Sequence, residues 1–481
     1  MKFEKVVVIT ALIWFTVTAI LSVGYFHTDE HYQIIEFANY LSAENDVQDL
    51  AWEFEARLRP SLQPVICHYI FSACEVLHVT SPYSKAIILR ILSGFFAIVC
   101  IYILTKKIKP ELPEKYWRSF FVLSFFLWFV PFLNVRFSSE NWSALILMLG
   151  VSQLITPSKS KYHHFIVGVL FGLSFLFRYQ VAIAVIGILL WVVFIQKISF
   201  VNVLKLVCGG VFVTGIGVVI DYLFYQEFSL TLWNYFQINL IEGKASEFGV
   251  SPWYSYFKWV VRYSASPVGV LILGSYMYFI VKNPKHLFTW LSIPFILIHC
   301  LISHKELRFL FPLVNFVPFV VCRTFADLRL TERFDNYKII SLIGAVVIVT
   351  NSFALSMAST IPLDFGRIEI TRFLYNKVQE RNTKLFYLDD CNVYSPYNIP
   401  TNYYKNDNVL IFHVDSCMLT DREFNGLFVI RAKDKEREKV NAFIENNQLK
   451  LLHKGTPNYA YIFMKIYGSH TGDIIELYGN D

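Results

Sequence analysis

Charged residues are scarce in this sequence. Only 17% of its 481 residues are Asp, Glu, Lys or Arg, whereas soluble proteins carry about a quarter. Hydrophobic residues make up 55% of the chain and aromatic residues 17%. Several apolar runs approach the length of about 20 residues that a helix needs to cross a bilayer. The composition therefore excludes an ordinary soluble protein and predicts a multi-pass helical membrane protein.

Two further features are missing. The eight cysteines include no CxxC pair, so the chain lacks the ligand spacing of a zinc site, and most of them are expected to be small core residues. The net charge of +6 is modest and reflects where the lysines fall. We therefore expect neither a nucleic acid nor another polyanion as a partner.

The first apolar run covers residues 6–26 and contains no charge. No small-x-small cleavage site precedes His27, which favours a retained span over a cleaved signal peptide. Ten further apolar segments lie near residues 86–104, 119–132, 142–155, 165–177, 181–195, 203–224, 267–281, 287–302, 309–322 and 339–357. They predict an all-α membrane domain of about eleven spans over residues 1–358.

Lysine and arginine clusters recur on alternate connections. They follow Lys2 and Lys5 in the connections near residues 106–118, 159–161, 197–205, 282–285 and 323–338. The positive-inside rule places these connections in the cytoplasm. A first external loop, residues 27–80, and a second large one, residues 225–262, then share the opposite face with residues 304–308. Both an endoplasmic reticulum membrane and a bacterial inner membrane fit this topology.

Residues 359–481 differ in pattern. Short alternating runs at residues 384–388, 408–412, 426–430 and 459–464 predict strands, and residues 434–446 predict a helix with Asp434 as its N-cap. An odd number of spans places this small α/β domain outside the cytoplasm. Cys391 and Cys417 each follow a predicted strand, and there they either form a disulfide or remain two thiols.

Asp29 and Glu30 are paired directly after the first span. They are flanked by His27 and His31 at the point where the chain leaves the bilayer. Acids drawn toward lipid lose solvation energy, so the pair is either simply solvated or belongs to a site that uses it.

Several cations also lie near this face. Arg90 is about a turn inside the second apolar segment, where an arginine either snorkels to the headgroups or binds an anion such as phosphate. His304, Lys305, Glu306 and Arg308 form a cluster at a span boundary. Such a cluster is either a solvated turn or an ion-paired site whose cations neutralise phosphate oxygens.

Aromatic residues alternate with polar ones over residues 220–239. Asp221, Asn234 and Asn239 lie among tyrosine, tryptophan and phenylalanine side chains. Aromatic rings can stack on sugars while amides and carboxylates bind the hydroxyl groups. An ordinary aromatic belt at the membrane interface is the alternative.

Together these segments resemble glycosyltransferase family 22, the polyprenyl-phosphate-mannose-dependent mannosyltransferases of GPI-anchor and asparagine-linked glycan assembly. Residues 27–33, HTDEHYQ, are similar to the family motif H-P-D-E-x-x-Q, with Thr28 in place of proline. Residues 304–312, HKELRFLFP, resemble H-K-E-x-R-F-x-x-P. Weaker matches lie at residues 52–60, 221–225, 233–239 and 243–249. The departures suggest a distant or bacterial member of the family.

The resemblance implies a fold of the GT-C type and an inverting transfer of mannose from a polyprenyl (dolichyl) phosphate donor to a lipid-linked saccharide on the non-cytoplasmic face. Asp29 would be the general base, with Glu30 supporting it or orienting the acceptor. Arg90, Lys305 and Arg308 would neutralise the leaving phosphate. The remaining substrate-binding candidates are Arg59, Asp221, Asn234, Asn239, His304 and Glu306.

No cofactor is required by this chemistry. His27, Asp29, Glu30 and His31 could hold a divalent cation, but adjacent residues seldom all converge on one ion, so we expect a metal-independent enzyme. Two other functions fit the same features: transfer of a different sugar to lipid A or a wall polymer, and transport of a lipid or saccharide. The acceptor and the linkage are beyond what the sequence determines.

Overall fold

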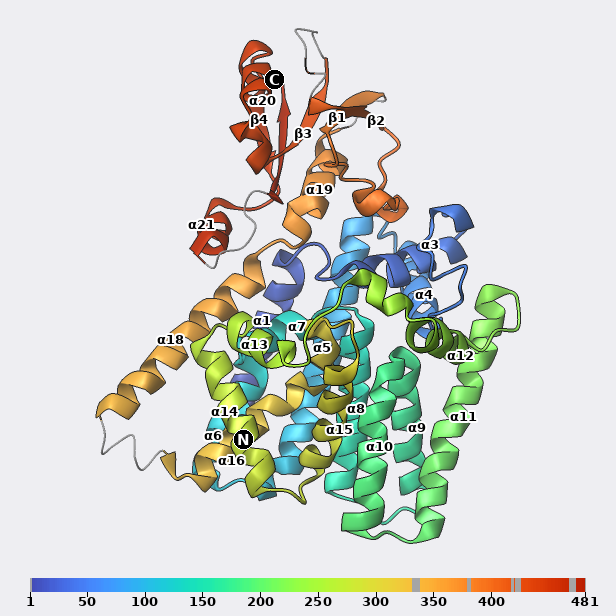
Figure 1. Cartoon of the computed structure of the whole chain (residues 1–481), viewed down its shortest axis with the longest axis vertical. Coiled ribbons are helices and arrows are strands. Elements are labelled where there is room, and N and C mark those ends of the chain that lie inside the picture. Colours follow the sequence, from blue (N-terminus) through green and yellow to red (C-terminus); the bar gives the residue numbers. More distant parts are fainter. Residues whose placement is uncertain are drawn as a thin grey trace. The chain divides into compact units, whose positions relative to one another are not determined.

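The computed structural model describes residues 2–330, 338–378, 382–416, 419, 425–466 and 473–480. The chain forms two compact units, both drawn in Figure 1. Unit 1 comprises Met1–Thr16, Ala56–Val65 and Arg90–Ala358, and unit 2 comprises Val17–Glu55, Ile66–Leu89 and Ser359–Asp481. The sequence groups residues 27–80 with the membrane domain, whereas in the structure most of them pack within the unit that contains the closing region.

Unit 1 is helical. Most residues of α1 (Lys2–Leu21), α5 (Pro82–Ile108) and α18 (Lys338–Thr360) belong to it. Its other helices are α6 (Glu114–Phe126), α7 (Phe129–Asn134), α8 (Ser139–Ile155), α9 (His163–Phe177), α10 (Ala182–Trp191), α11 (Phe200–Tyr225), α12 (Thr231–Phe236), α13 (Ser255–Tyr263), α14 (Pro267–Lys282), α15 (Leu287–Leu301) and α16 (Val317–Asp327), and the 3-10 segment η8 (Leu307–Phe316) precedes α16.

Five helical stretches in the described part of the chain are long and apolar enough to cross a membrane. They are Lys2–Leu21, Pro82–Glu111, Phe200–Tyr225, Leu307–Asp327 and Ser341–Thr360. Four shorter apolar stretches are His163–Phe177, Tyr179–Phe194, Pro267–Lys282 and Leu287–Leu301. Other predicted segments are interrupted: residues 119–132 are divided between α6 and α7 by the extended backbone of Leu127. The total of about eleven spans stays a prediction.

Helix α9 packs between α8 and α11, and glycines set its approach to α11 (Figure 1). A Cβ added to Gly168 of α9 would lie 1.9 Å from the Leu206 carbonyl oxygen of α11. In return, a Cβ on Gly209 of α11 would lie 2.2 Å from the Phe165 carbonyl oxygen. Small residues at such crossings let two backbones meet, and the close packing that results favours helix association in membranes.

We therefore expect Gly209→Ala to reduce the thermal stability of the purified protein, because the added methyl group forces α9 and α11 apart. Overpacking of this kind costs about 1–3 kcal/mol. Gly215 lies on the same helix, and a Cβ there has no heavy atom within 4 Å. Gly215→Ala is the matched control and should leave the melting temperature unchanged or slightly raised, since alanine favours helix. Equal melting temperatures for the two variants would contradict the close crossing.

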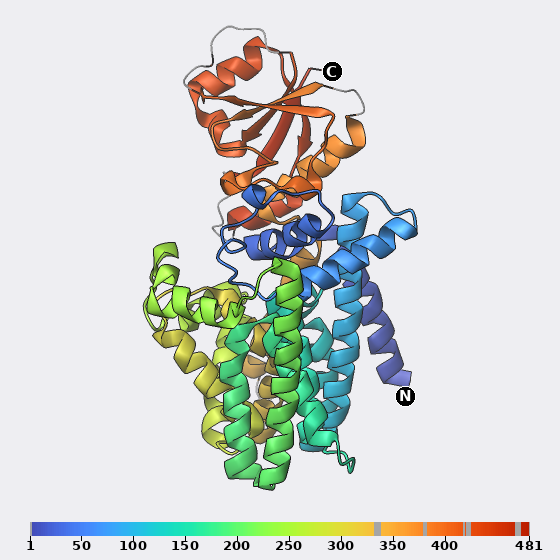
Figure 2. The same cartoon turned by 90° about the vertical axis from the view of Figure 1, so that its right-hand side faces the viewer.

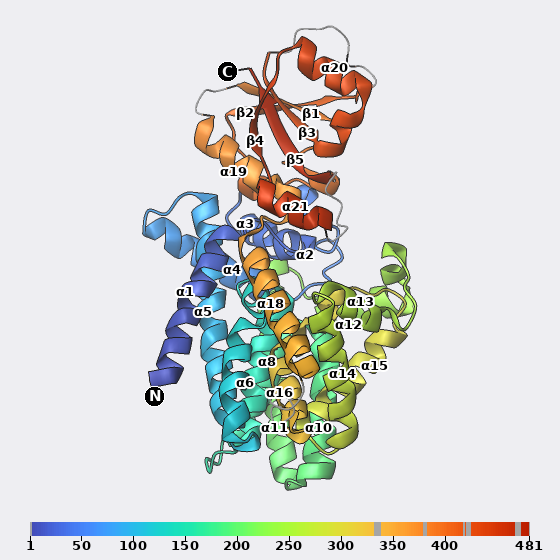
Figure 3. The same cartoon turned by 90° about the vertical axis from the view of Figure 1, so that its left-hand side faces the viewer.

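Unit 2 contains a five-stranded sheet with the strand order β2-β1-β3-β5-β4, seen in Figure 2 and labelled in Figure 3. The strand β1 (Thr383–Leu388) pairs in parallel with β2 (Val409–Val414) and with β3 (Leu427–Arg431). The strand β5 (Ile475–Gly479) is antiparallel to both β3 and β4 (Lys450–Lys454). The sheet is thus mixed.

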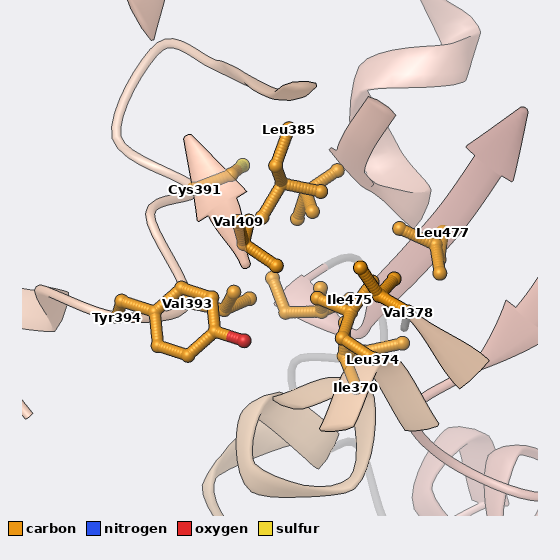
Figure 4. Close-up of a cluster of buried hydrophobic side chains, with 11 residues drawn as sticks. Ile370, Leu374, Val378, Leu385, Cys391, Val393, Tyr394, Val409, Ile475 and Leu477 are labelled. Carbon is orange, nitrogen blue, oxygen red and sulfur yellow. The ribbon is translucent and has the colours of Figure 1, made fainter. Parts of the chain in front are cut away.

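Alternating side chains give the sheet two buried faces. Val429 of β3 packs with Ile370 and Leu374 of α19 (Arg367–Lys377), in the cluster drawn in Figure 4. Its neighbours Phe428 and Ile430 point to the other face and pack with α20 (Glu438–Asn446). The period of two along β3 therefore matches helices on both sides of the sheet.

Three predicted strands of this unit are confirmed as β1, β2 and β3, but the strand predicted at residues 459–464 is wrong. These residues form α21 (Asn458–Ile466), with Ala460 buried and Tyr459 and Ile462 exposed. A short apolar run has no period that separates a strand from a helix. The strands β4 and β5 lie outside the predicted set.

The predicted helix cap and disulfide have different outcomes. Asp434 is not the N-cap of α20: it lies in the 3-10 turn η13 (Ala432–Glu436), where its buried carboxylate accepts a hydrogen bond from Arg431 Nε at 3.0 Å. Cys391 is buried, and burial raises the pKa of its thiol to about 12. Cys417 lies outside the described residues, so the Cys391–Cys417 disulfide stays a prediction.

The N-terminal part of unit 2 is a chain of short helices. They are α2 (Thr28–Glu30), the π-helix η1 (His31–Ile35), α3 (Glu36–Leu41), η2 (Val47–Asp49) and, in large part, α4 (Leu62–Val76). Gly24 precedes them with a φ of +91°, and a Cβ there would lie 3.2 Å from the Leu363 carbonyl oxygen. The Leu363 N–H donates to the Val23 carbonyl at 2.7 Å. This turn joins the first segment of unit 2 to its last.

Candidate active site

Asp29 lies on the single turn of α2. Its backbone N–H donates to Nδ1 of His27, the N-cap residue, at 3.3 Å. The Asp29 carboxylate lies 3.4 Å from the same ring nitrogen, and 18% of the side chain is exposed. His27 therefore holds the backbone of the turn beside the acid, and the Asp29 carboxylate is partly exposed, so a substrate hydroxyl could come within hydrogen-bond reach of it.

Glu30 is turned inward. Its Oε2 accepts a hydrogen bond from the Phe26 backbone N–H at 2.9 Å, and the residue is buried. The neighbouring acids of the motif therefore differ: the Asp29 carboxylate is partly exposed, whereas the Glu30 carboxylate closes the turn that leads into α2. This placement agrees better with a supporting role for Glu30 than with direct proton transfer.

His31 is paired with Glu36. Its Nε2 lies 2.7 Å from Glu36 Oε1, and both side chains are almost fully buried. Glu36 is absent from the residues singled out by sequence, although a glutamate within an apolar helix was a usable signal. In the described part of the chain, no group of three or more His, Cys, Asp or Glu side chains is arranged to hold a metal ion.

The charged motif of residues 304–308 lies in unit 1 and centres on Glu140 of α8. Glu140 Oε1 accepts hydrogen bonds from Arg178 Nη1 at 2.8 Å and from Arg308 Nη1 at 2.9 Å. Arg308 also binds Glu306 in a bidentate manner, at 2.6 and 3.1 Å. Both guanidinium groups lie over the Phe309 ring. Sequence reasoning missed Glu140, although an acid inside an apolar segment needs a partner.

The neighbouring residues of this motif bind a loop of the same unit. His304 Nε2 lies 2.9 Å from Glu306 Oε1, and its Nδ1 lies 2.9 Å from the Gly249 carbonyl oxygen. Lys305 Nζ donates to the Ser251 carbonyl at 2.9 Å and to that of Ile302. The motif is therefore an internally paired network in which Lys305 and Arg308 are buried and His304 and Glu306 are partly exposed.

Asp221 of α11 is also buried. Its Oδ1 accepts hydrogen bonds from the Ser61 N–H at 2.8 Å and the Ser61 hydroxyl at 2.6 Å, and its Oδ2 accepts one from the Thr231 hydroxyl at 2.6 Å. These bonds hold residues 59–61 and the start of α12 against α11. The structure thus assigns this carboxylate an anchoring role; sugar binding by Asp221 stays a prediction.

The other candidates of this region differ in position. Asn234 donates to the Ala56 carbonyl at 3.3 Å, and Asn239 donates to the Tyr235 carbonyl at 3.1 Å. The Arg59 guanidinium lies 5.9 Å from the centre of the Tyr235 ring. Arg90 is buried within α5. Unit 1 therefore brings Arg59 together with the aromatic segment, while Arg308 joins the ion-pair network of Glu140.

The fold matches that of a protein of known structure. The chain aligns with ArnT from Cupriavidus metallidurans, crystallised with undecaprenyl phosphate, with a TM-score of 0.51 over 98% of this chain and 97% of that chain. The sequences are only 9% identical, so the likeness is one of fold. The chain thus has the fold of the GT-C class of membrane glycosyltransferases.

The family is established by sequence comparison. The model of the Alg9-like mannosyltransferase family matches residues 6–399, and the chain belongs to that family. It is 30% identical over 328 residues to GPI mannosyltransferase 3 of Yarrowia lipolytica, covering 65% of this chain and 60% of that protein. It is 23% identical over 387 residues to GPI mannosyltransferase 3 of Debaryomyces hansenii, covering 73% of this chain and 64% of that protein. The chain spans less than two thirds of the length of these relatives.

Proposed function

We propose that this protein is an inverting mannosyltransferase. It moves mannose from a polyprenyl (dolichyl) phosphate donor to a lipid-linked saccharide on the non-cytoplasmic face of its membrane. Membership of the mannosyltransferase family supports the sugar. The names of the curated relatives support a glycolipid acceptor of the GPI type.

The observation that carries the proposal is the position and partial exposure of the Asp29 carboxylate. Its carboxylate is partly exposed and lies beside His27 on α2, within the segment that matches the family motif. In the reaction, the acceptor hydroxyl gives its proton to Asp29 as its oxygen attacks the anomeric carbon. The bond from that carbon to the phosphate oxygen breaks, and the polyprenyl phosphate leaves from the opposite face. One carboxylate is sufficient because phosphate is already a good leaving group.

The donor phosphate requires fixed positive charge in the transition state. In unit 1, the arginines Arg178 and Arg308 share one oxygen of Glu140, so their remaining N–H groups are held in a rigid arrangement. We propose that Arg308 and Lys305, with Arg90, interact with the phosphate. Guanidinium groups suit this task because their planar forks match phosphate geometry.

The function is tested with the full chain in lipid nanodiscs, a radiolabelled mannosyl phosphate polyprenol and two acceptors, a GPI-precursor glycolipid and a diphosphate-linked oligosaccharide. We expect label to enter one of these lipids, and excess EDTA to leave the rate unchanged, because the proposed chemistry uses no metal. Transfer from labelled polyprenyl-phosphate arabinose or glucose, without transfer from the mannose donor, would favour another sugar. Movement of labelled lipid across vesicles without a new glycosidic bond would identify a transporter instead.

A further inference from the structure

We infer that the buried His31–Glu36 pair, together with the segment 396–404 that encloses it, positions the Asp29 carboxylate for proton transfer. The inference rests on the proposed function, since it presumes that Asp29 is the base. It adds residues that position Asp29 from the closing region of the chain. These residues belong to none of the motifs in the membrane segments.

The pairing depends on an unusual helix. Residues His31–Ile35 form a π-helix, in which the Glu36 N–H donates to the His31 carbonyl five residues earlier. In an α-helix, side chains four apart lie on one face, whereas the wider π turn brings residues five apart closer to one face. The π turn therefore aims the side chains of His31 and Glu36 at each other. Such turns are frequent at functional sites.

Aromatic rings pack against the histidine. The His31 ring is stacked on Tyr25 at a centroid distance of 5.2 Å with an interplanar angle of 18°, and on Tyr404 at 5.3 Å with an angle of 12°. The ring can neither tilt nor slide without separating these stacks. His31 is accordingly 0% exposed.

The glutamate is tied to the same closing segment. Besides His31, the Glu36 carboxylate accepts hydrogen bonds from Asn45 Nδ2 at 2.7 Å and from the Tyr403 backbone N–H at 3.2 and 3.3 Å. The Tyr32 hydroxyl lies 3.3 Å from the Pro396 carbonyl oxygen and 3.2 Å from that of Ile399. Segment 396–404 is thus hydrogen-bonded to the His31–Glu36 stretch at several residues.

These contacts act on the position of Asp29 through the chain between them. Helix α2 has three residues and continues directly into η1, so Asp29 is two residues from the locked His31 ring. A single turn is not stable alone, because helix nucleation is costly. The orientation of α2 therefore depends on η1, to which it is joined, together with the contacts of His27 and Glu30 at its start. Displacement of a reacting group by about 1 Å can lower a rate by about 10²-fold.

The test compares three variants of the full chain in nanodiscs. Tyr404→Leu removes one stacking ring and should lower kcat for mannosyl transfer by about 10- to 100-fold per folded molecule, with KM for the donor unchanged. Tyr404→Phe keeps the ring and should restore most of kcat. Phe443→Leu removes a similarly buried aromatic side chain from the sheet core of the same unit, and should lower the melting temperature without changing kcat.

A second route avoids the aromatic stack. Glu36→Gln keeps the shape of the side chain and should also lower kcat, by at least about fivefold. In an Asp29→Asn background, adding Tyr404→Leu should leave the residual rate unchanged, because both changes act on one group.

The outcomes separate the two claims. Wild-type kcat in Tyr404→Leu and Glu36→Gln, with Asp29→Asn inactive, would overturn the positioning role and leave the proposed base intact. Full activity of Asp29→Asn would overturn the proposed base itself. Failure of both Tyr404→Leu and Glu36→Gln to fold would mark the cluster as structural and also overturn the inference.

Discussion

Asp29→Asn should lower the rate of mannosyl transfer by about 10²- to 10⁴-fold, the usual contribution of a general base. The substituted amide has nearly the same shape and leaves the α2 backbone bond to His27 in place. It cannot accept the proton of the acceptor hydroxyl at neutral pH. The measurement is the initial rate of label transfer at saturating donor and acceptor.

Two controls accompany this variant. Asp46→Asn changes an exposed acid in the same unit and should keep the wild-type rate. Glu30→Gln should have a smaller effect on the rate than Asp29→Asn, since Glu30 binds the Phe26 N–H and is buried. A larger loss of rate in Glu30→Gln, with Asp29→Asn active, would make Glu30 the general base and Asp29 the supporting acid.

Glu140→Ala should lower the free energy of unfolding by about 3–5 kcal/mol, the typical result of removing one partner from a buried ion pair. The change leaves Arg178 buried at 4% exposure with the Ser139 hydroxyl at 3.2 Å in place of a carboxylate. Arg308 keeps its bidentate pairing with Glu306. The measurement is the thermal midpoint and the yield of monodisperse protein in detergent, both independent of activity.

The matched control for Glu140 is Glu114→Ala in α6. Glu114 is 68% exposed and lies 3.5 Å from Lys109. Exposed pairs contribute about 0–1 kcal/mol, so this variant should resemble the wild type. Glu140→Gln retains one acceptor oxygen, so its thermal midpoint should lie between those of Glu140→Ala and Glu114→Ala. Wild-type stability of Glu140→Ala would show that other groups compensate the buried arginines.

Much of the membrane unit could be predicted from sequence because its signal is local. Long apolar runs become helices wherever they occur, since a bilayer leaves no other way to satisfy the backbone. The runs behind α1, α5, α11 and α18 are recognisable for this reason. In the sheet, β1 to β3 have clear strand patterns. The prediction missed β4 and β5 and took α21 for a strand. The conformation of such short runs depends on the segments that pack against them.

The candidate site divides in the same way. The motif around Asp29 and the cluster of residues 304–308 are contiguous in the chain, so the spacing of the residues was enough to find them. Glu140 and Glu36 were not found. The partners of Glu140 lie up to 168 residues away, and those of Glu36 up to 367 residues away. The local sequence does not indicate which distant group an acid will contact.

The sequence by itself therefore determined that the chain is a helical membrane protein with an acidic motif after its first span, because hydrophobic length and contiguous motifs act locally. Only the tertiary structure decided which acid is exposed and which is buried, and which arginines share a carboxylate. It also decided that residues 396–404 hold the helix that continues from Asp29. These features depend on contacts between segments far apart in the chain. Burial of a polar group costs free energy unless another group forms a hydrogen bond or ion pair with it.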